Sequence, residues 1–312
     1  MRVVVKPLAF ETLGVRGMCT YVETPDVRVL IDAGASLGMR FGLLPHPREY
    51  RALMEARRLI REYAERCEVV TVSHYHYDHY TPAWRDRDYV WTWSCLEEAE
   101  AVYGGKVVLA KDVRGAINHS QRVRGWLFER SVRGFVGRLE VADGREFAFN
   151  RTIVRFSPPV PHGEEGSGLG WVLMTCIEHE GFRLVHTSDV QGQRPSMVIV
   201  GGPPTYLAEG RVSSASIARG LEGVARLAER LGAVVVDHHL ARDEGWRVRV
   251  EGELRRRGVE ARFMSAAELL GRGDMLLEAR RRRLYEEEPP GEEFMRWARM
   301  RGDERRRAPP PV

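Results

Sequence analysis

Apolar residues along this chain fall into two patterns, and together they predict a succession of strands and helices. Short apolar or alternating runs bounded by turn residues indicate strands. The longer stretch 48–67, rich in Ala, Leu, Arg and Glu and preceded by Pro47, indicates a helix, and a shorter helix is expected over 94–103. Strands are expected near 2–7, 18–24, 27–33, 68–73, 106–110, 138–142, 146–157, 170–178, 182–187, 196–200 and 233–237.

The last third of the chain carries clear helix boundaries. A helix is expected over 214–231, with Ser213 or Ser214 as its N-cap and Gly232 as its stop. Residues 254–271 are expected to add helix and strand edges. After about residue 280 the chain becomes charged and proline-rich, so a helix followed by a mobile tail is expected there.

Residues 73–81 carry the densest candidate chemistry and read Ser-His-Tyr-His-Tyr-Asp-His-Tyr-Thr, directly after an apolar strand. Four potential metal ligands fall within them: His74, His76, Asp78 and His79. His74 and His76 stand two apart, so an extended backbone points both side chains the same way. Asp78 and His79 follow on the turn, where the chain can direct them toward a second ion. Imidazole and carboxylate together suit zinc, iron or manganese better than calcium or magnesium.

This His-x-His-x-Asp-His pattern resembles the second motif of the metallo-β-lactamase superfamily, and the other motifs occur in the expected order. Asp32 ends an early apolar strand, His162 lies in a Pro-His-Gly sequence well downstream, and Asp189 follows another strand. The last motif, a His at the end of a late strand, is offered by His238 and His239. The resemblance covers about residues 1–245. In general layout the chain looks most like an uncharacterised archaeal branch of predicted hydrolases.

The resemblance implies a site for two divalent metal ions, with zinc expected and iron or manganese as alternatives. The implied ligands are His74, His76 and His162 for one ion, Asp78, His79 and His238 for the other, and Asp189 bridging both. Alignment of the late strand favours His238 over His239, which would then lie in the substrate pocket or behind the ligands. Asp32 would orient the ligand loop without touching metal.

The fold implied by the resemblance is a four-layer αββα sandwich of the α/β (α+β) class. Two mixed β-sheets pack face to face in it, and helices cover the outer faces. A single domain of this kind is expected over residues 1–280, and residues 281–312 are expected to form a charged helix and a proline-rich mobile tail.

Charge counting indicates what such a site would do. Two divalent ions contribute +4, Asp78 and Asp189 return −2, and a bridging hydroxide leaves the site at +1. Such a site brings the pKa of its water toward neutrality and stabilises negative charge on an attacked carbonyl or phosphoryl oxygen. The sequence therefore predicts a metallohydrolase, with Asp78 and Asp189 as catalytic carboxylates. The hydroxide would attack an ester-type bond, a phosphoester or a lactone, of a small-molecule substrate.

The net charge, the apolar runs and the cysteines indicate which partners and which cellular compartment to expect. A net charge of +4 is too small to indicate nucleic-acid binding by itself. The start of the chain lacks the apolar region of a signal peptide, and no apolar run approaches the length of a membrane span. The four cysteines have no paired metal spacing and are expected to be free thiols in a reducing compartment. We expect a cytoplasmic protein with no membrane partner, and the sequence is silent on its oligomeric state.

Two alternative functions stay open. A metal-dependent nuclease acting on RNA or DNA would need a basic groove that leads to the metals. A non-catalytic scaffold on the same fold would be expected to have lost ligands, whereas every ligand position here is filled. The polar stretch 118–124 could bring a phosphate- or carboxylate-reading Arg to the site, or be a solvated loop. Tyr206, which follows a Gly-Gly-Pro-Pro turn, is a further candidate pocket residue.

Overall fold

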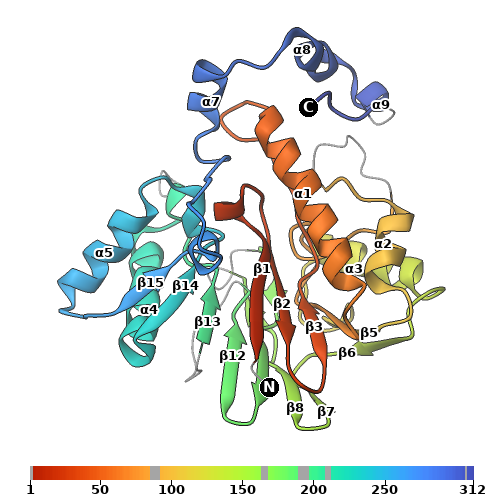
Figure 1. Ribbon diagram of the computed structural model, residues 1–312, viewed down its shortest axis with the longest axis vertical. Helices are drawn as coiled ribbons and strands as arrows, with labels where there is room; N and C mark the ends of the chain where they lie inside the picture. Colours follow the sequence, from red (N-terminus) through yellow and green to blue (C-terminus); the bar gives the residue numbers. More distant parts are fainter. Residues whose placement is uncertain (1–2, 85–91, 163–167, 189–196, 208–211, 306–307) are drawn as a thin grey trace.

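Two β-sheets form the centre of the protein, and helices cover their outer faces (Figure 1). The structure is a computed structural model that describes residues 3–84, 92–162, 168–188, 197–207, 212–305 and 308–312. Apolar side chains of both sheets form one shared core, in which Met18 and Val29 of the first sheet belong with Ile177 and Leu184 of the second. The four-layer αββα arrangement predicted from the sequence is confirmed.

The first sheet contains six strands, and their order in the sheet is their order along the chain. These strands are β1 (Val4–Phe10), β2 (Met18–Glu23), β3 (Arg28–Ile31), β4 (Val69–Val72), β5 (Val107–Ala110) and β6 (Arg138–Val141). β1 to β3 pair antiparallel and β3 to β6 pair parallel, so the sheet is mixed. All four residues of β4 are buried, because the sheet is covered on both faces.

The second sheet contains seven strands and is also mixed. In sheet order they are β15 (Arg262–Met264), β14 (Ala233–Val236), β13 (Met197–Val200), β12 (Phe182–His186), β11 (Thr175–His179), β8 (Thr152–Phe156) and β7 (Glu146–Phe149). β12 to β15 pair parallel, and the remaining neighbours pair antiparallel. A separate hairpin joins β9 (Val160–Pro161) to β10 (Trp171–Val172).

The helices divide between the two outer faces. α1 (Pro47–Ala64), α2 (Leu96–Tyr103) and α3 (His119–Val132) share a core with the first sheet, and α4 (Ser214–Leu231) and α5 (Trp246–Arg256) share one with the second. The described residues also form three 3-10 turns, η1 (Glu11–Leu13), η2 (Thr205–Leu207) and η3 (Leu240–Arg242). Four short helices complete the described part: α6 (Ala266–Leu269), α7 (Arg281–Glu287), α8 (Glu292–Arg299) and α9 (Gly302–Arg305).

Most of the predicted elements are confirmed to within a few residues. α4 occupies the predicted range, its N-cap Ser213 accepts a hydrogen bond from the Ser216 backbone N–H, and Gly232 ends it in a left-handed conformation. Two predicted strands, 146–157 and 170–178, are wrong as single elements. The second is divided into β10, which pairs with β9, and β11, which lies in the seven-stranded sheet. In the first, β7 is followed by a turn and then by β8. The chain turns at Asn150, which has a φ of 51°, and forms the antiparallel pair β7 and β8. Asn tolerates this left-handed conformation better than most residues do.

The solvated-loop interpretation of residues 118–124 is also wrong, because this stretch begins α3. The side chain of Asn118 caps the helix by accepting a hydrogen bond from the Gln121 backbone N–H at 2.8 Å. Asn followed three residues later by Gln is the pattern of a helix N-terminus. This spacing could have revealed the helix from the sequence.

The C-terminal segment packs on the N-terminal end of α1 (Figure 1). Phe294 and Trp297 of α8 are buried against Tyr50 of α1, with ring centroids 5.9 and 5.7 Å away. The Trp297 indole N–H donates a hydrogen bond to the Ala308 carbonyl at 2.8 Å. The boundary near residue 280 and the mobility of the tail stay predictions. Across the described ranges, no helix combines the length and the apolar character needed to cross a bilayer.

Candidate metal centre

The loop that follows β4 is held in place by Asp32, which follows the neighbouring strand β3. Because β3 and β4 are parallel, their carboxyl ends meet at the same edge of the sheet. One oxygen of Asp32 accepts a hydrogen bond from the Ser73 backbone N–H at 2.8 Å, and the other accepts one from the Ser73 hydroxyl at 2.5 Å. That second oxygen also lies 2.8 Å from Nδ1 of His79. Asp32 therefore fixes both the start of the loop and one of its imidazoles.

Gly34 lets this loop pass close to the end of β3. A Cβ at Gly34 would lie 2.3 Å from the Tyr80 backbone nitrogen and 2.5 Å from that of His79, which is closer than real Cβ atoms approach. The Asp-Ala-Gly sequence after β3 thus supplies both a carboxylate and the space for the ligand loop.

Three histidines form the first group of potential ligands. One nitrogen from each of His74, His76 and His162 lies within 4.8 Å of the others. Nε2 of His74 and Nδ1 of His76 are 3.0 Å apart, and the His162 ring centroid lies 5.4 and 4.8 Å from theirs. His162 follows β9, and its backbone N–H donates a hydrogen bond to the Gly170 carbonyl across the β9–β10 hairpin.

Asp78, His79 and His238 form the second group, whose ligand atoms also lie within 4.8 Å of one another. His238 follows β14 with a φ of 55°, and Asp32 has a φ of 49° at the end of β3. Left-handed conformations of this kind cost free energy and recur at functional sites. A further grouping joins Asp32 to His74 and His79, but both Asp32 oxygens are already engaged by Ser73 and His79.

The structure separates the two late histidines. Within the described residues, His238 is the one grouped with Asp78 and His79. His239 stacks on the His238 ring at 4.3 Å, with its centroid 5.7 Å from that of His162, and it lines the adjoining cavity. The geometry agrees with the preference for His238, and the role of each predicted residue as a metal ligand stays a prediction.

Asp189 lies outside the described residues. Its neighbour Ser188 is placed with its hydroxyl 3.0 Å from that of Ser73, directly before His74.

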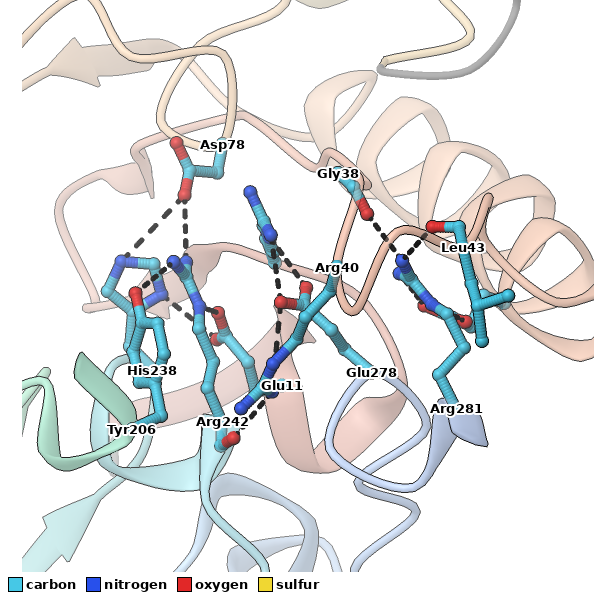
Figure 2. A network of polar contacts seen from close by, with 12 residues as sticks. Glu11, Gly38, Arg40, Leu43, Asp78, Tyr206, His238, Arg242, Glu278 and Arg281 are labelled. Atoms are coloured by element: carbon cyan, nitrogen blue, oxygen red, sulfur yellow. Dashed lines mark hydrogen bonds and ion pairs between the residues drawn. The ribbon is translucent and has the colours of Figure 1, made fainter. Parts of the chain in front are cut away.

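Two buried residues that sequence reasoning missed support the second group (Figure 2). Glu11, in η1, lies 2.9 Å from Nδ1 of His238 and accepts a hydrogen bond from Nε of Arg242 at 2.7 Å. Arg242, in η3, also donates to Asp78 and to the Tyr206 hydroxyl, at 3.2 Å in each case. The contacts of Glu11 with His238 and of Arg242 with Asp78 join positions more than 160 residues apart, so no local sequence pattern indicates them.

Burial and the neighbouring charges shift the pKa values of two carboxyl groups in this network, Glu11 and Asp78. Burial raises the pKa of Glu11 to about 7, although the charge of Arg242 opposes the shift. For Asp78, burial acts in the same upward direction, but His79, His238 and Arg242 outweigh it and hold its pKa well below the usual value. Asp78 is therefore ionised, and a carboxylate must be deprotonated to bind a metal.

A cavity of about 330 Å³ opens beside the two groups. Its lining includes His76, Asp78, His162, His238 and His239. The same cavity is lined by Arg16, Arg124, Arg242, Tyr77 and Tyr206, which makes its wall both cationic and aromatic. A larger cavity of about 600 Å³ lies between β1, α1 and residues 270–275, but it contains no residue of either ligand group. The candidate metal ligands therefore lie at the smaller cavity.

The donor set fits a transition-metal centre. Imidazole nitrogens with carboxylate oxygen are donors preferred by zinc, iron and manganese. His79 has a carboxylate behind its Nδ1, and so does His238, which is how proteins orient histidine ligands. A buried set of imidazoles around an ionised aspartate is what a bound cation requires.

Comparison with known sequences places the chain in a family. It is 42% identical over 307 residues to a UPF0282 protein of Methanopyrus kandleri, covering 94% of this chain and all of the relative. A UPF0282 protein of Pyrobaculum neutrophilum is 45% identical over 300 residues, covering 91% of this chain and 94% of the relative. The chain belongs to the UPF0282 family. No family model matches this UPF0282 protein. The predicted similarity to an archaeal branch is confirmed.

Solved structures identify the fold of this UPF0282 protein. The metallo-β-lactamase fold protein YhfI of Bacillus subtilis is similar with a TM-score of 0.52 and 13% identity, covering 85% of this chain and 97% of that one. An isothiocyanate hydrolase from Delia radicum gut bacteria is similar with a TM-score of 0.50 and 14% identity, covering 85% and 96%. At this identity the likeness establishes the fold alone. The predicted metallo-β-lactamase fold is confirmed.

Proposed function

We propose that this UPF0282 protein is a metal-dependent hydrolase that holds two divalent ions and cleaves an ester-type bond, a phosphoester or a lactone, of a small-molecule substrate. The observation that carries the proposal is the pair of adjoining donor groups at the wall of the cavity. His74, His76 and His162 would hold one ion, and Asp78, His79 and His238 the other. Asp189 is assigned as the bridging ligand from the order of the sequence motifs. Zinc is the proposed metal, with iron and manganese as alternatives.

Bound divalent ions would supply Lewis acidity and a water of lowered pKa. The residues of the chain position the ligands and the substrate around them. Asp32 and Glu11 fix the rings of His79 and His238. Arg242 places a permanent positive charge beside Asp78 and the Tyr206 hydroxyl. His239 brings a further imidazole to the cavity wall, where it can exchange a proton with a leaving group.

The cavity favours a small substrate over a nucleic acid. Its volume of about 330 Å³ is in the range of small-molecule sites. Arg16 and Arg242 on its wall are paired with Glu278 and Glu11, so they do not act as a basic track for a phosphate backbone. A scaffold role is disfavoured because each predicted ligand among the described residues lies in one of the two groups. The hydrolase named among the similar structures supports the reaction class only by analogy.

The test is hydrolysis of a chromogenic phosphodiester, a lactone and a thioester, with metal content measured on the same protein sample. We expect turnover of at least one substrate, lost in Asp78→Ala together with metal. Glu65→Ala, on the exposed end of α1, serves as the control and should retain both. Two ions per chain with no turnover of any ester would contradict the proposed bond class. Turnover that survives in Asp78→Ala would contradict the metal-dependent mechanism.

A further inference from the structure

Helix α3 brings a second functional face to the cavity, beside the first ligand group. The Nε2 atom of Gln121 lies 3.3 Å from Nε2 of His76, so this face of the helix reaches the ligand loop. Gly125 permits the close approach, since a Cβ there would lie 2.5 Å from the Tyr75 ring and 2.6 Å from Val113. Arg124 stands three residues after Gln121 and therefore lies on the same side of α3, roughly 4.5 Å farther along the helix axis.

Arg124 is half-buried and lines the cavity together with His76 and Asp78. Its guanidinium lies over the Tyr77 ring, 4.6 Å from the centroid, and donates a long hydrogen bond of 3.4 Å to the Tyr75 carbonyl. Both contacts orient the side chain, and among the described residues the Tyr75 carbonyl is the acceptor of its hydrogen bond. Within the described part of the chain, no carboxylate pairs with it.

The other arginines of the cavity wall differ from Arg124 in this respect. Arg16 makes a bidentate contact with Glu278, at 2.6 and 2.8 Å. Arg242 is held by Glu11 and Asp78. Their charges are compensated within the protein, whereas the charge of Arg124 faces the cavity without a carboxylate among the described residues. A guanidinium in this position matches the two oxygens of a carboxylate or a phosphate.

We propose that Arg124 binds an oxyanion of the substrate, a phosphate or a carboxylate, close to the bond that is cleaved. This inference rests on the proposed hydrolase function and narrows its substrate to an anion. It favours an anionic phosphoester, or a lactone that carries a carboxylate, over a neutral lactone. Because α3 places Arg124 about one helical turn from the contact with His76, the anion and the cleaved bond would be separated by only a few bonds.

The test compares substrates that differ in one negative charge: a neutral ester and the same ester carrying a carboxylate, beside a phosphodiester and its neutral methyl triester. The measured quantity is the ratio of kcat/KM for the anionic and the neutral member of each pair. We expect Arg124→Gln to lower this ratio by about tenfold or more, chiefly through a higher KM for the anion, and Arg124→Lys to lower it less. The pair with the larger loss identifies the oxyanion as carboxylate or phosphate.

The matched control is Arg122→Gln. Arg122 is exposed on the same helix and points about 200° away from Arg124. Its variant should keep the wild-type ratio, so that a change confined to Arg124 reports the cavity and not the net charge. An unchanged ratio in Arg124→Gln, or equal losses in both variants, would overturn the proposal.

A second readout separates this inference from the proposed function. Binding of inorganic phosphate to the metal-loaded protein is measured by calorimetry in wild type, Arg124→Gln and Arg122→Gln. We expect weaker binding only in Arg124→Gln, and this result would support the anion site even if no ester were hydrolysed. Equal phosphate affinity in all three proteins would overturn the anion site while leaving a measured hydrolase activity intact.

Discussion

The imidazole of His238 lies with its Nδ1 atom 2.9 Å from the carboxylate of Glu11, although the two residues are 227 positions apart. Both side chains are almost completely buried. A histidine that donates its Nδ1–H to a carboxylate has its other nitrogen fixed in place, with the tautomer that a metal needs. The N-terminal turn η1 therefore supports His238, a candidate ligand that follows β14 much later in the chain.

Replacing Glu11 by Gln should weaken metal binding at the second group. The substitution keeps the size of the side chain but removes the negative charge that Glu11 carries above its pKa of about 7. Changes of this kind cost about 10- to 100-fold in metal affinity. Competition with a chelator measures this affinity directly. Glu65→Gln, on the surface end of α1, should leave it unchanged. Equal affinities in both variants would show that Glu11 does not support His238.

The space at Gly34 is expected to be as necessary as the ligands themselves. A methyl group in Gly34→Ala would collide with the backbone of His79 and Tyr80, which cannot rotate away as a side chain could. We expect a loss of about 1–3 kcal/mol in the free energy of unfolding, together with reduced metal content. Gly252→Ala is the control, since it lies in α5 with open space around it, and Ala should stabilise that helix slightly. Full stability and metal content in Gly34→Ala would contradict the close-packing argument.

The pair formed by Arg281 and Glu49 fixes the segment after residue 280 to α1. Both side chains are fully buried, and Arg281 also donates hydrogen bonds to the carbonyls of Gly38 and Leu43. Arg281→Met should cost about 3–5 kcal/mol, because it leaves a buried carboxylate without its partner. Glu49→Gln in the same chain should recover part of this loss, since Gln still accepts the hydrogen bond from the His46 backbone N–H. Denaturant unfolding of the two single variants and the double variant measures the coupling. If the stability losses of the two single variants simply add in the double variant, the two side chains are not coupled.

Acid should remove the stabilisation that Glu278 provides. Burial acts to raise its pKa, but the charge and hydrogen bonds of Arg16 outweigh it and lower the pKa from 4.5 to about 2. Because the folded-state pKa is the lower one, the stabilisation is complete above the unfolded pKa and is lost as pH falls from about 4.5 to about 2. At pH 7 it is on the order of 3 kcal/mol.

Urea unfolding at pH 7, 5 and 3 tests this direction of the pH dependence of stability. The difference between wild type and Glu278→Gln should be largest at pH 7 and 5 and should shrink at pH 3. The exposed pair of Arg48 and Glu288 provides the control, and Glu288→Gln should change stability by no more than about 1 kcal/mol at any pH. A difference for Glu278→Gln that grows toward low pH would contradict the pairing.

The candidate ligands could be predicted from the sequence more readily than the residues that support them, and the reason is physical. His74, His76, Asp78 and His79 are contiguous and follow an apolar strand, so their spacing alone indicates where they lie. Glu11 gives no such signal, because its contact with His238 arises from packing between remote segments. The same limit applies to the buried pair of Arg281 with Glu49, since a charged residue in an arginine-rich stretch is usually solvated.

Helix α3 shows a different limit of sequence reasoning. The polar composition of its N-terminal turn favours a loop, although Asn118 and Gln121 have the spacing of a helix start. Whether this stretch brings an anion-binding Arg to the site could not be decided from the sequence, because only the fold shows where the stretch lies. The structure does place Arg124 on the cavity wall, next to the loop that the sequence identified.

The metal content of the purified chain, measured by elemental analysis beside the protein concentration, shows whether the two donor groups bind two ions. We expect two divalent ions per chain in wild type, and one in each of His162→Ala and His238→Ala, because these residues belong to different groups. No metal, or a single ion lost equally in both variants, would contradict a centre built from two separate donor groups.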